Sequence, residues 1–126
     1  MRLIRQPKNS QQCGQACVAM IAGVSLSHSL QVFGWNGCTS VKRMVKALTA
    51  YNISLPKHQL TRMGRNTVLP NNCILKLRWT DYKGIQQSHW VVKHGKDIYD
   101  PGRGGRNPIY NPLVKPRFTS YLEYET

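Results

Sequence analysis

The spacing of apolar residues changes once along the chain, after Pro56, and no other feature of the sequence constrains the fold as much. Before Pro56, apolar residues recur at intervals of three and four, which places their side chains on one face of a helix. After a region rich in Pro and Asn at positions 56–72, short β-rich runs bounded by turn residues follow instead. Helices that precede antiparallel strands predict an α+β fold, and a length of 126 residues predicts that positions 1–126 form a single domain.

Three helices are predicted in the first half. Helical spacing begins near Cys13 and fades at Gly23. A short second helix is expected after a cap at Ser27, and a third after a cap at Thr39 or Ser40. The third is the most regular, because its apolar residues occupy one face (Val41, Met44, Val45 and Leu48).

The second half predicts antiparallel strands. The runs CILKLRW at 73–79 and HWVVK at 89–93 are rich in β-formers, and the residues between them can turn the chain. PGRGGRNP at 101–108 is expected to be a loop, and the tail at 111–126 to end in a last strand.

A tight hairpin is predicted to bring two polar side chains to the same face of the sheet. Gly95 suits the first central position of a two-residue type II′ turn, with Lys96 as the second. Residues whose numbers sum to 191 then stand opposite each other. In that register His89 and Asp100 share a face as diagonal neighbours, with Cα atoms roughly 7 to 8 Å apart, close enough for a side-chain hydrogen bond.

The charge is strongly positive, with 18 Lys and Arg against 5 Asp and Glu, a formal net charge of +13. All carboxylates follow position 80 (Asp81, Asp97, Asp100, Glu123 and Glu125). Such a chain is expected to attract an acidic peptide or protein, or to have nonspecific affinity for nucleic acid. The longest apolar stretch, around residues 16–26, is too short to span a bilayer and nothing resembles a signal peptide, so a cytoplasmic location is expected.

The four cysteines lack the spacing of paired zinc ligands, so neither a metal nor a cofactor is predicted. Without an export signal, reduced thiols are expected. Cys17, Cys38 and Cys73 are interpreted as core residues.

Cys13 has the setting of a nucleophile. At the start of a helix, the macrodipole and unpaired backbone N–H groups favour a thiolate and can receive the oxyanion of a tetrahedral intermediate. Gly14 is expected to leave room for a substrate backbone. His89 is the predicted base and Asp100 the group that orients it, the arrangement that nucleophilic catalysis requires. The plainer alternative is a buried apolar thiol and a strand histidine with a structural role.

Four blocks of the sequence, CGQACVAMIAG, GCTSVKRMVKALTAYNI, CILKLRW and HWVVKHGKDIYDP, resemble in this order the papain-like cysteine peptidases of clan CA. The most similar branch is that of the leader-peptide peptidases of bacteriocin exporters, the double-glycine type, and their stand-alone relatives. The resemblance implies a papain-like fold in which N-terminal helices pack on an antiparallel sheet. It also implies Cys13 as nucleophile, His89 as base and Asp100 as orienting acid. An oxyanion-hole glutamine is expected at Gln6, with Gln12 and Gln11 as alternatives.

The sequence thus predicts a small stand-alone cysteine hydrolase that cleaves a peptide or isopeptide bond through Cys13, His89 and Asp100. Two alternatives stay open. One is a thiol-dependent acyltransferase or deamidase with the same triad. The other is a basic binding module, for nucleic acid or an acidic protein, on a vestigial papain-like fold.

Overall fold

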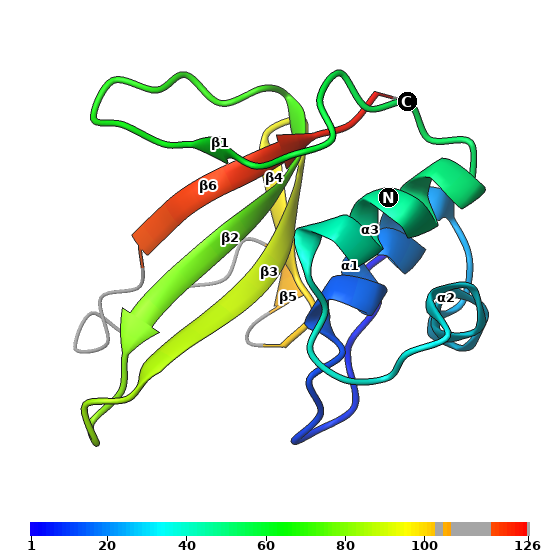
Figure 1. Ribbon diagram of the computed structural model, residues 1–126, viewed down its shortest axis with the longest axis horizontal. Helices are drawn as coiled ribbons and strands as arrows, with labels where there is room; N and C mark the ends of the chain where they lie inside the picture. Colours follow the sequence, from blue (N-terminus) through cyan, green and yellow to red (C-terminus); the bar gives the residue numbers. More distant parts are fainter. Residues whose placement is uncertain (103–104, 107–116, 126) are drawn as a thin grey trace.

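The computed structural model describes residues 1–102, 105–106 and 117–125. The helices are α1 (Cys13–Ala22), α2 (Leu26–Phe33) and α3 (Val41–Ala50). The strands are β1 (Thr61–Arg62), β2 (Asn72–Thr80), β3 (Gln86–His94), β4 (Asp97–Asp100), β5 (Gly105–Arg106) and β6 (Arg117–Glu123). Figure 1 shows the helices gathered on one side of the sheet, which confirms the α+β class.

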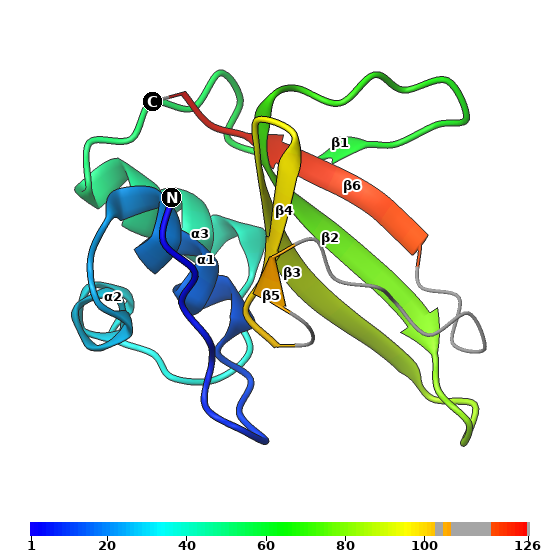
Figure 2. The same ribbon diagram turned by 180° about the vertical axis from the view of Figure 1, so that it is seen from behind.

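The six strands form one antiparallel sheet in the order β1-β6-β2-β3-β4-β5. The long central pair joins Asn72 of β2 to His94 of β3 at one end and Thr80 to Gln86 at the other. On its other side β2 pairs with β6, and the register shifts between Lys76 and Leu77. Figure 2 shows the N-terminal segment running between α1 and the β4–β5 edge, where Gln6 N donates to the carbonyl of Pro101 at 2.9 Å.

The helix boundaries follow from local chemistry. Gly23 adopts a left-handed conformation (φ 70°) and ends α1 as predicted. Ser25, not Ser27, caps α2: its hydroxyl accepts a hydrogen bond from the amide of His28, so the predicted cap was two residues late. Ser40 caps α3 in the same way, accepting from the amide of Arg43.

Alternation along the strands divides the apolar residues between two clusters. The larger cluster lies between the helices and the sheet and contains Cys17, Met44 and Leu48 against Ile74 and Val92. The smaller cluster is formed by residues that alternate, along β2 and β3, with the sheet residues of the larger cluster (Cys73, Leu75, Leu77 and Val91). α1 therefore packs on β3 with its first turn close to the strand that carries His89.

Two strands lie where the sequence predicted none. β1 lies in the Pro- and Asn-rich region, and β5, Gly105–Arg106, lies in the segment predicted as a loop. Each is only two residues long. β1 forms because it pairs with β6, and β5 because it pairs with β4, rather than through a pattern in its own sequence. The predicted last strand exists as β6, while positions 111–116 and 126 of that prediction lie outside the described residues.

No single helix among the described residues is long and apolar enough to cross a bilayer. Taken together, α1 and α2 are sufficiently long and apolar, but they are bent by 111° at the break between them.

Candidate active site

The β3–β4 hairpin has the predicted register. Lys93 pairs with Ile98 and His94 with Asp97, and Gly95 has a φ of 63°, as the first position of its turn requires. His89 Nε2 and Asp100 Oδ1 are 2.6 Å apart. The side chain of Asp100 is fully buried and that of His89 is 10 % exposed, so the pair is largely shielded from water.

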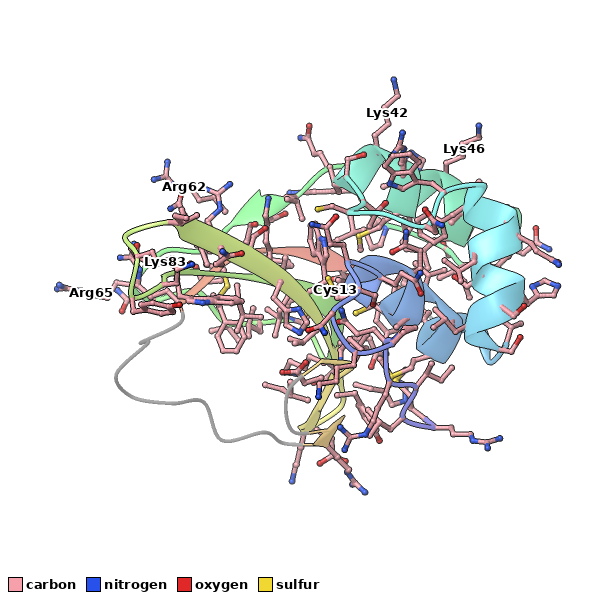
Figure 3. The ribbon with its side chains drawn as sticks, turned by 90° about the horizontal axis from the view of Figure 1, so that it is seen from below. Cys13, Lys42, Lys46, Arg62, Arg65 and Lys83 are labelled. Carbon is pink, nitrogen blue, oxygen red and sulfur yellow. The ribbon has the colours of Figure 1, made fainter. Side chains whose placement is uncertain are left out.

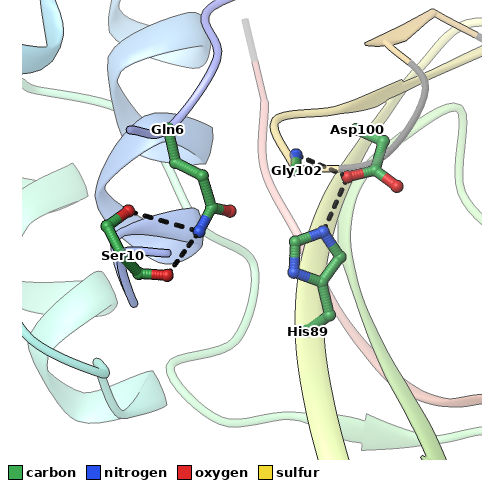
Figure 4. A network of polar contacts seen from close by, with 5 residues as sticks. All are labelled: Gln6, Ser10, His89, Asp100 and Gly102. Carbon is green, nitrogen blue, oxygen red and sulfur yellow. Dashed lines mark hydrogen bonds and ion pairs between the residues drawn. The ribbon is translucent and has the colours of Figure 1, made fainter. Parts of the chain in front are cut away.

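The Asp100 carboxylate is fixed by its own loop. The amide of Gly102 donates to Asp100 Oδ1 at 2.8 Å, the same oxygen that contacts His89 (Figure 4). A β-carbon on Gly102 would lie 2.8 Å from His89 Cε1 and 3.0 Å from Gln6 Oε1. Only glycine fits here without displacing the imidazole or the amide. This role of Gly102 was not predicted, although the turn residues Pro101 and Gly102 directly after Asp100 were a usable signal.

Cys13 lies near His89 and belongs to the helices rather than to the sheet. It is the first residue of α1 and is 9 % exposed. Burial lowers the pKa of His89, but hydrogen bonds to Asp100 and Cys13 and the charges of both groups outweigh it and raise the pKa to about 9. Because Nε2 is engaged by Asp100, Nδ1 is the nitrogen that remains for Cys13. The structure therefore brings Cys13, His89 and Asp100 together.

The start of α1 offers backbone donors beside the sulfur. The first intrahelical bond runs from the amide of Ala16 to the carbonyl of Gln12, so helix geometry leaves the N–H groups of the preceding residues without intrahelical acceptors. The side chain of Gln12 caps none of them. These N–H groups can donate to an oxygen that becomes negative next to Cys13 Sγ.

Gln6 reaches the site with its oxygen rather than its nitrogen. Its Nε2 donates to the carbonyl of Ser10 at 2.8 Å and lies 3.4 Å from Ser10 Oγ. Its Oε1 is buried, faces the His89 side in Figure 4, and has no hydrogen-bond partner among the described residues. In this arrangement the amide of Gln6 is not aimed as a donor at an oxyanion, which is the role the resemblance implied for it.

The two alternative glutamines are placed differently. Gln11 is exposed. Gln12 is the N-cap residue of α1, directly before Cys13, and its Oε1 is buried without a hydrogen-bond partner in the described part of the chain. The backbone donors of the first turn are thus better placed than any of the three side chains.

Gly14 has a different role from the predicted one. A β-carbon here would lie 2.1 Å from Thr39 Cγ2 and 3.5 Å from Trp90 Cδ1. The space over Gly14 is therefore filled by the protein itself and does not admit a substrate backbone. Gly14 instead allows α1 to pack closely against Thr39 and β3.

The other cysteines differ from Cys13 in their surroundings. Cys17 is fully buried, and burial, followed by the charges of Cys13 and Asp100, raises its pKa well above the usual value. Burial likewise raises the pKa of Cys73 to about 11. Cys38 is exposed, so its prediction as a core residue was wrong: it lies in the loop between α2 and α3.

The ring of Trp79 makes a T-shaped contact with the ring of His89. The ring centroids are 6.4 Å apart and the angle between the ring planes is 77°. Trp79 is two positions beyond Leu77, the β2 partner of His89, so it shares that face of the sheet. Within the described ranges, no group of three or more His, Cys, Asp or Glu side chains is placed to hold a metal ion.

Comparison with known proteins yields no matching family model and no match among curated proteins.

Proposed function

We propose that the protein is a papain-like cysteine hydrolase that cleaves peptide or isopeptide bonds with Cys13 as nucleophile, His89 as acid and base, and Asp100 as the orienting group. The observation that carries the proposal is the buried His89–Asp100 hydrogen bond of 2.6 Å, with Cys13 among the neighbouring groups that raise the pKa of His89. A buried carboxylate on one side of His89, and a cysteine at a helix start nearby, are the groups that nucleophilic catalysis requires.

The first half of the reaction forms an acyl-enzyme. Since the pKa of His89 is about 9, its ring is protonated at neutral pH and can stabilise a thiolate on Cys13. The thiolate attacks the carbonyl carbon, and the carbonyl oxygen takes the negative charge near the N–H groups of the first turn of α1. His89 then donates its proton to the leaving amine, the C–N bond breaks, and a thioester on Cys13 remains.

The second half restores the enzyme. Neutral His89 removes a proton from a water molecule, whose oxygen attacks the thioester carbonyl. The C–S bond breaks, the acid product leaves, and the thiolate of Cys13 again faces a protonated imidazole. Asp100 keeps the ring in one orientation through both halves, because its Oδ1 is itself fixed by the amide of Gly102.

Alkylation tests the nucleophile without knowledge of the substrate. We expect iodoacetamide at pH 6 to label Cys13 at least about tenfold faster than Cys38, because an ordinary thiol is almost entirely protonated at that pH. Cys38 is a matched control within the same molecule, since it is exposed and Cys13 is nearly buried. His89→Gln should slow labelling of Cys13 and leave Cys38 unchanged. Equal rates for the two thiols at pH 6 would contradict the assignment.

The pH profile of cleavage tests the role of His89. Because leaving-group protonation needs the imidazolium, kcat/KM should fall as pH rises through about 9, the pKa of His89. The measurement is peptide cleavage between pH 6 and 10, with analysis of the products for hydrolysis, acyl transfer or deamidation. An upper limb that begins near pH 6.5, the usual value for histidine, would show that the pair with Asp100 does not control the reaction.

A further inference from the structure

A basic groove of about 490 Å³ lies on the sheet. Four of its lining residues are cations and none is acidic (Arg62, Lys76, Arg78 and Arg117). They come from strands β1, β2 and β6, so residues distant in the sequence gather in one place. We call this surface the basic groove.

The strand register explains how the cations come together. Lys76 on β2 and Arg62 on β1 both pair with Ser120 on the intervening β6. In the next row, Arg78 stands directly opposite Arg117. Like charges directly opposite each other destabilise a sheet, so this pair is a cost that folding alone does not explain. A bound anion would remove the repulsion.

In the described part of the chain, no carboxylate forms an ion pair with the cations of the groove. Among the described residues the ion pairs are His89–Asp100 and Arg106–Asp97. Every Asp and Glu of the sequence falls within the described residues, so no acidic side chain neutralises the groove. Burial, followed by the charge of Arg78, lowers the pKa of Lys76 despite an opposing contribution from Cys38.

The basic groove leads toward the candidate nucleophile. Lys76 Nζ lies 5.3 Å from the ring centroid of Trp90, its partner on β3 and the residue after His89. The ring of Trp90 in turn packs over Gly14, which follows Cys13. One row of residues therefore runs from the outer strand of the sheet to the first turn of α1, where Gly14 follows Cys13. Figure 3 shows Cys13 between the part of the sheet that carries Arg62 and the helix that carries Lys42 and Lys46.

We propose that the basic groove binds acidic residues of the peptide substrate on one side of the scissile bond. This rests on the proposed function and specifies its substrate class. Neighbouring strands are about 4.8 Å apart and an extended peptide advances about 3.3 Å per residue, so the cations on β2, β6 and β1 match carboxylates roughly two to five positions from the bond.

Several features favour a peptide over a nucleic acid as the ligand. The groove is short, with two rows of cations across three strands, which suits a few residues better than a long phosphate backbone. Its polar residues can pair with peptide groups, since Gln86, Thr119 and Ser120 also line it. Its one aromatic lining residue, Phe118, is half-buried and packs against the smaller apolar cluster, so it is a poor platform for a stacked base.

Cleavage profiling tests the proposal. A peptide mixture from a digested proteome is incubated with the protein, and the residues around each cut are counted. We expect Asp and Glu to be enriched on one side, two to five positions from the bond. In Arg78→Gln/Arg117→Gln, cleavage of peptides with two such carboxylates should fall about tenfold, because each exposed charge pair contributes about two- to fivefold. This variant should fold, since it removes a like-charge pair.

Lys42→Gln/Lys46→Gln is the matched control, because it removes the same charge from the exposed face of α3. It should leave the preference for acidic residues intact. Cleavage without acidic enrichment would overturn the groove proposal and leave the hydrolase proposal standing. The absence of any cleavage, with slow labelling of Cys13, would overturn the hydrolase proposal itself.

Binding separates peptide from nucleic acid. Cys13→Ala is titrated against a fluorescein-labelled peptide with four glutamates and against a labelled twelve-nucleotide oligo(dT), each in 0.1 M salt. The proposal expects tighter binding of the peptide, weakened by Arg78→Gln/Arg117→Gln and by 0.5 M salt. Tighter binding of the oligonucleotide, lost in the same groove variant, would overturn the proposal in favour of a nucleic-acid site.

Discussion

The two halves of the candidate site are built by different means. His89 and Asp100 are eleven positions apart in one hairpin, and its two-residue turn sets their register. Cys13 and Gln6 come from α1 and the N-terminal segment, and they reach the hairpin only because the helices pack on the sheet. Local geometry thus fixes the acid–base pair, whereas tertiary packing fixes the thiol and the amide. Substitutions in the hairpin half and in the helix half should therefore have different effects on catalysis and stability.

The largest effect is expected in the hairpin half, from Asp100→Asn. Loss of the buried carboxylate charge should lower kcat/KM by about 10²- to 10⁴-fold, by analogy with triads that lose their acid. It should also lower the pKa of His89 and move the upper limb of the pH profile to lower pH. Asp97→Asn in the same strand removes an exposed ion pair with Arg106 and should change kcat/KM less than about twofold. Equal kinetics for the two variants would refute a special role for Asp100.

Gly102→Ala should have the next largest effect. Its new β-carbon would displace the imidazole of His89, and a misplacement of about 1 Å can cost on the order of 100-fold in rate. The comparison is Gly64→Ala, where the nearest atom to a new β-carbon is 3.7 Å away. We expect slow cleavage and slow labelling of Cys13 at pH 6 in the first variant alone. A fully active Gly102→Ala variant would show that the loop carrying Gly102 moves to accommodate the methyl group and that the imidazole of His89 stays in place.

In the helix half, Gly14→Ala should act on stability. The added methyl group would collide with Thr39 Cγ2, and such overpacking costs about 1 to 3 kcal/mol in free energy of unfolding. Thr39→Ser removes that methyl group, so the double variant should recover most of the loss, as urea denaturation can measure. Without recovery, the contact with Thr39 would not be the reason for glycine at this position.

The smallest effect is expected from Gln6→Ala. Because Nε2 of Gln6 donates to Ser10, we expect kcat/KM to fall less than about tenfold, whereas loss of an oxyanion donor costs about 10²- to 10³-fold. Peptide cleavage and Tm measured on the same preparation distinguish a catalytic loss from local unfolding. A fall above 100-fold with unchanged Tm would mean that the amide turns toward the substrate during the reaction.

Much of the helix and strand content followed from the sequence, because apolar spacing and turn residues are local signals. The α1 boundary at Gly23 and the turn at Gly95 are confirmed, and both depend on positive φ values that glycine adopts easily. Strands β1 and β5 were not predicted, since two residues carry no periodicity and are formed by their partners. The cap of α2 was placed at Ser27 instead of Ser25, because serine at either position can accept the capping bond.

The sequence by itself determined that His89 and Asp100 lie together, because a two-residue turn admits one strand register and alternation then fixes the face. It also determined that Cys13 begins a helix. Only the tertiary structure decided that this helix start lies near the imidazole, and that neighbouring side chains fill the space beside Gly102 and Gly14. Those facts depend on contacts between segments distant in the chain, and close packing of side chains sets them rather than any local preference.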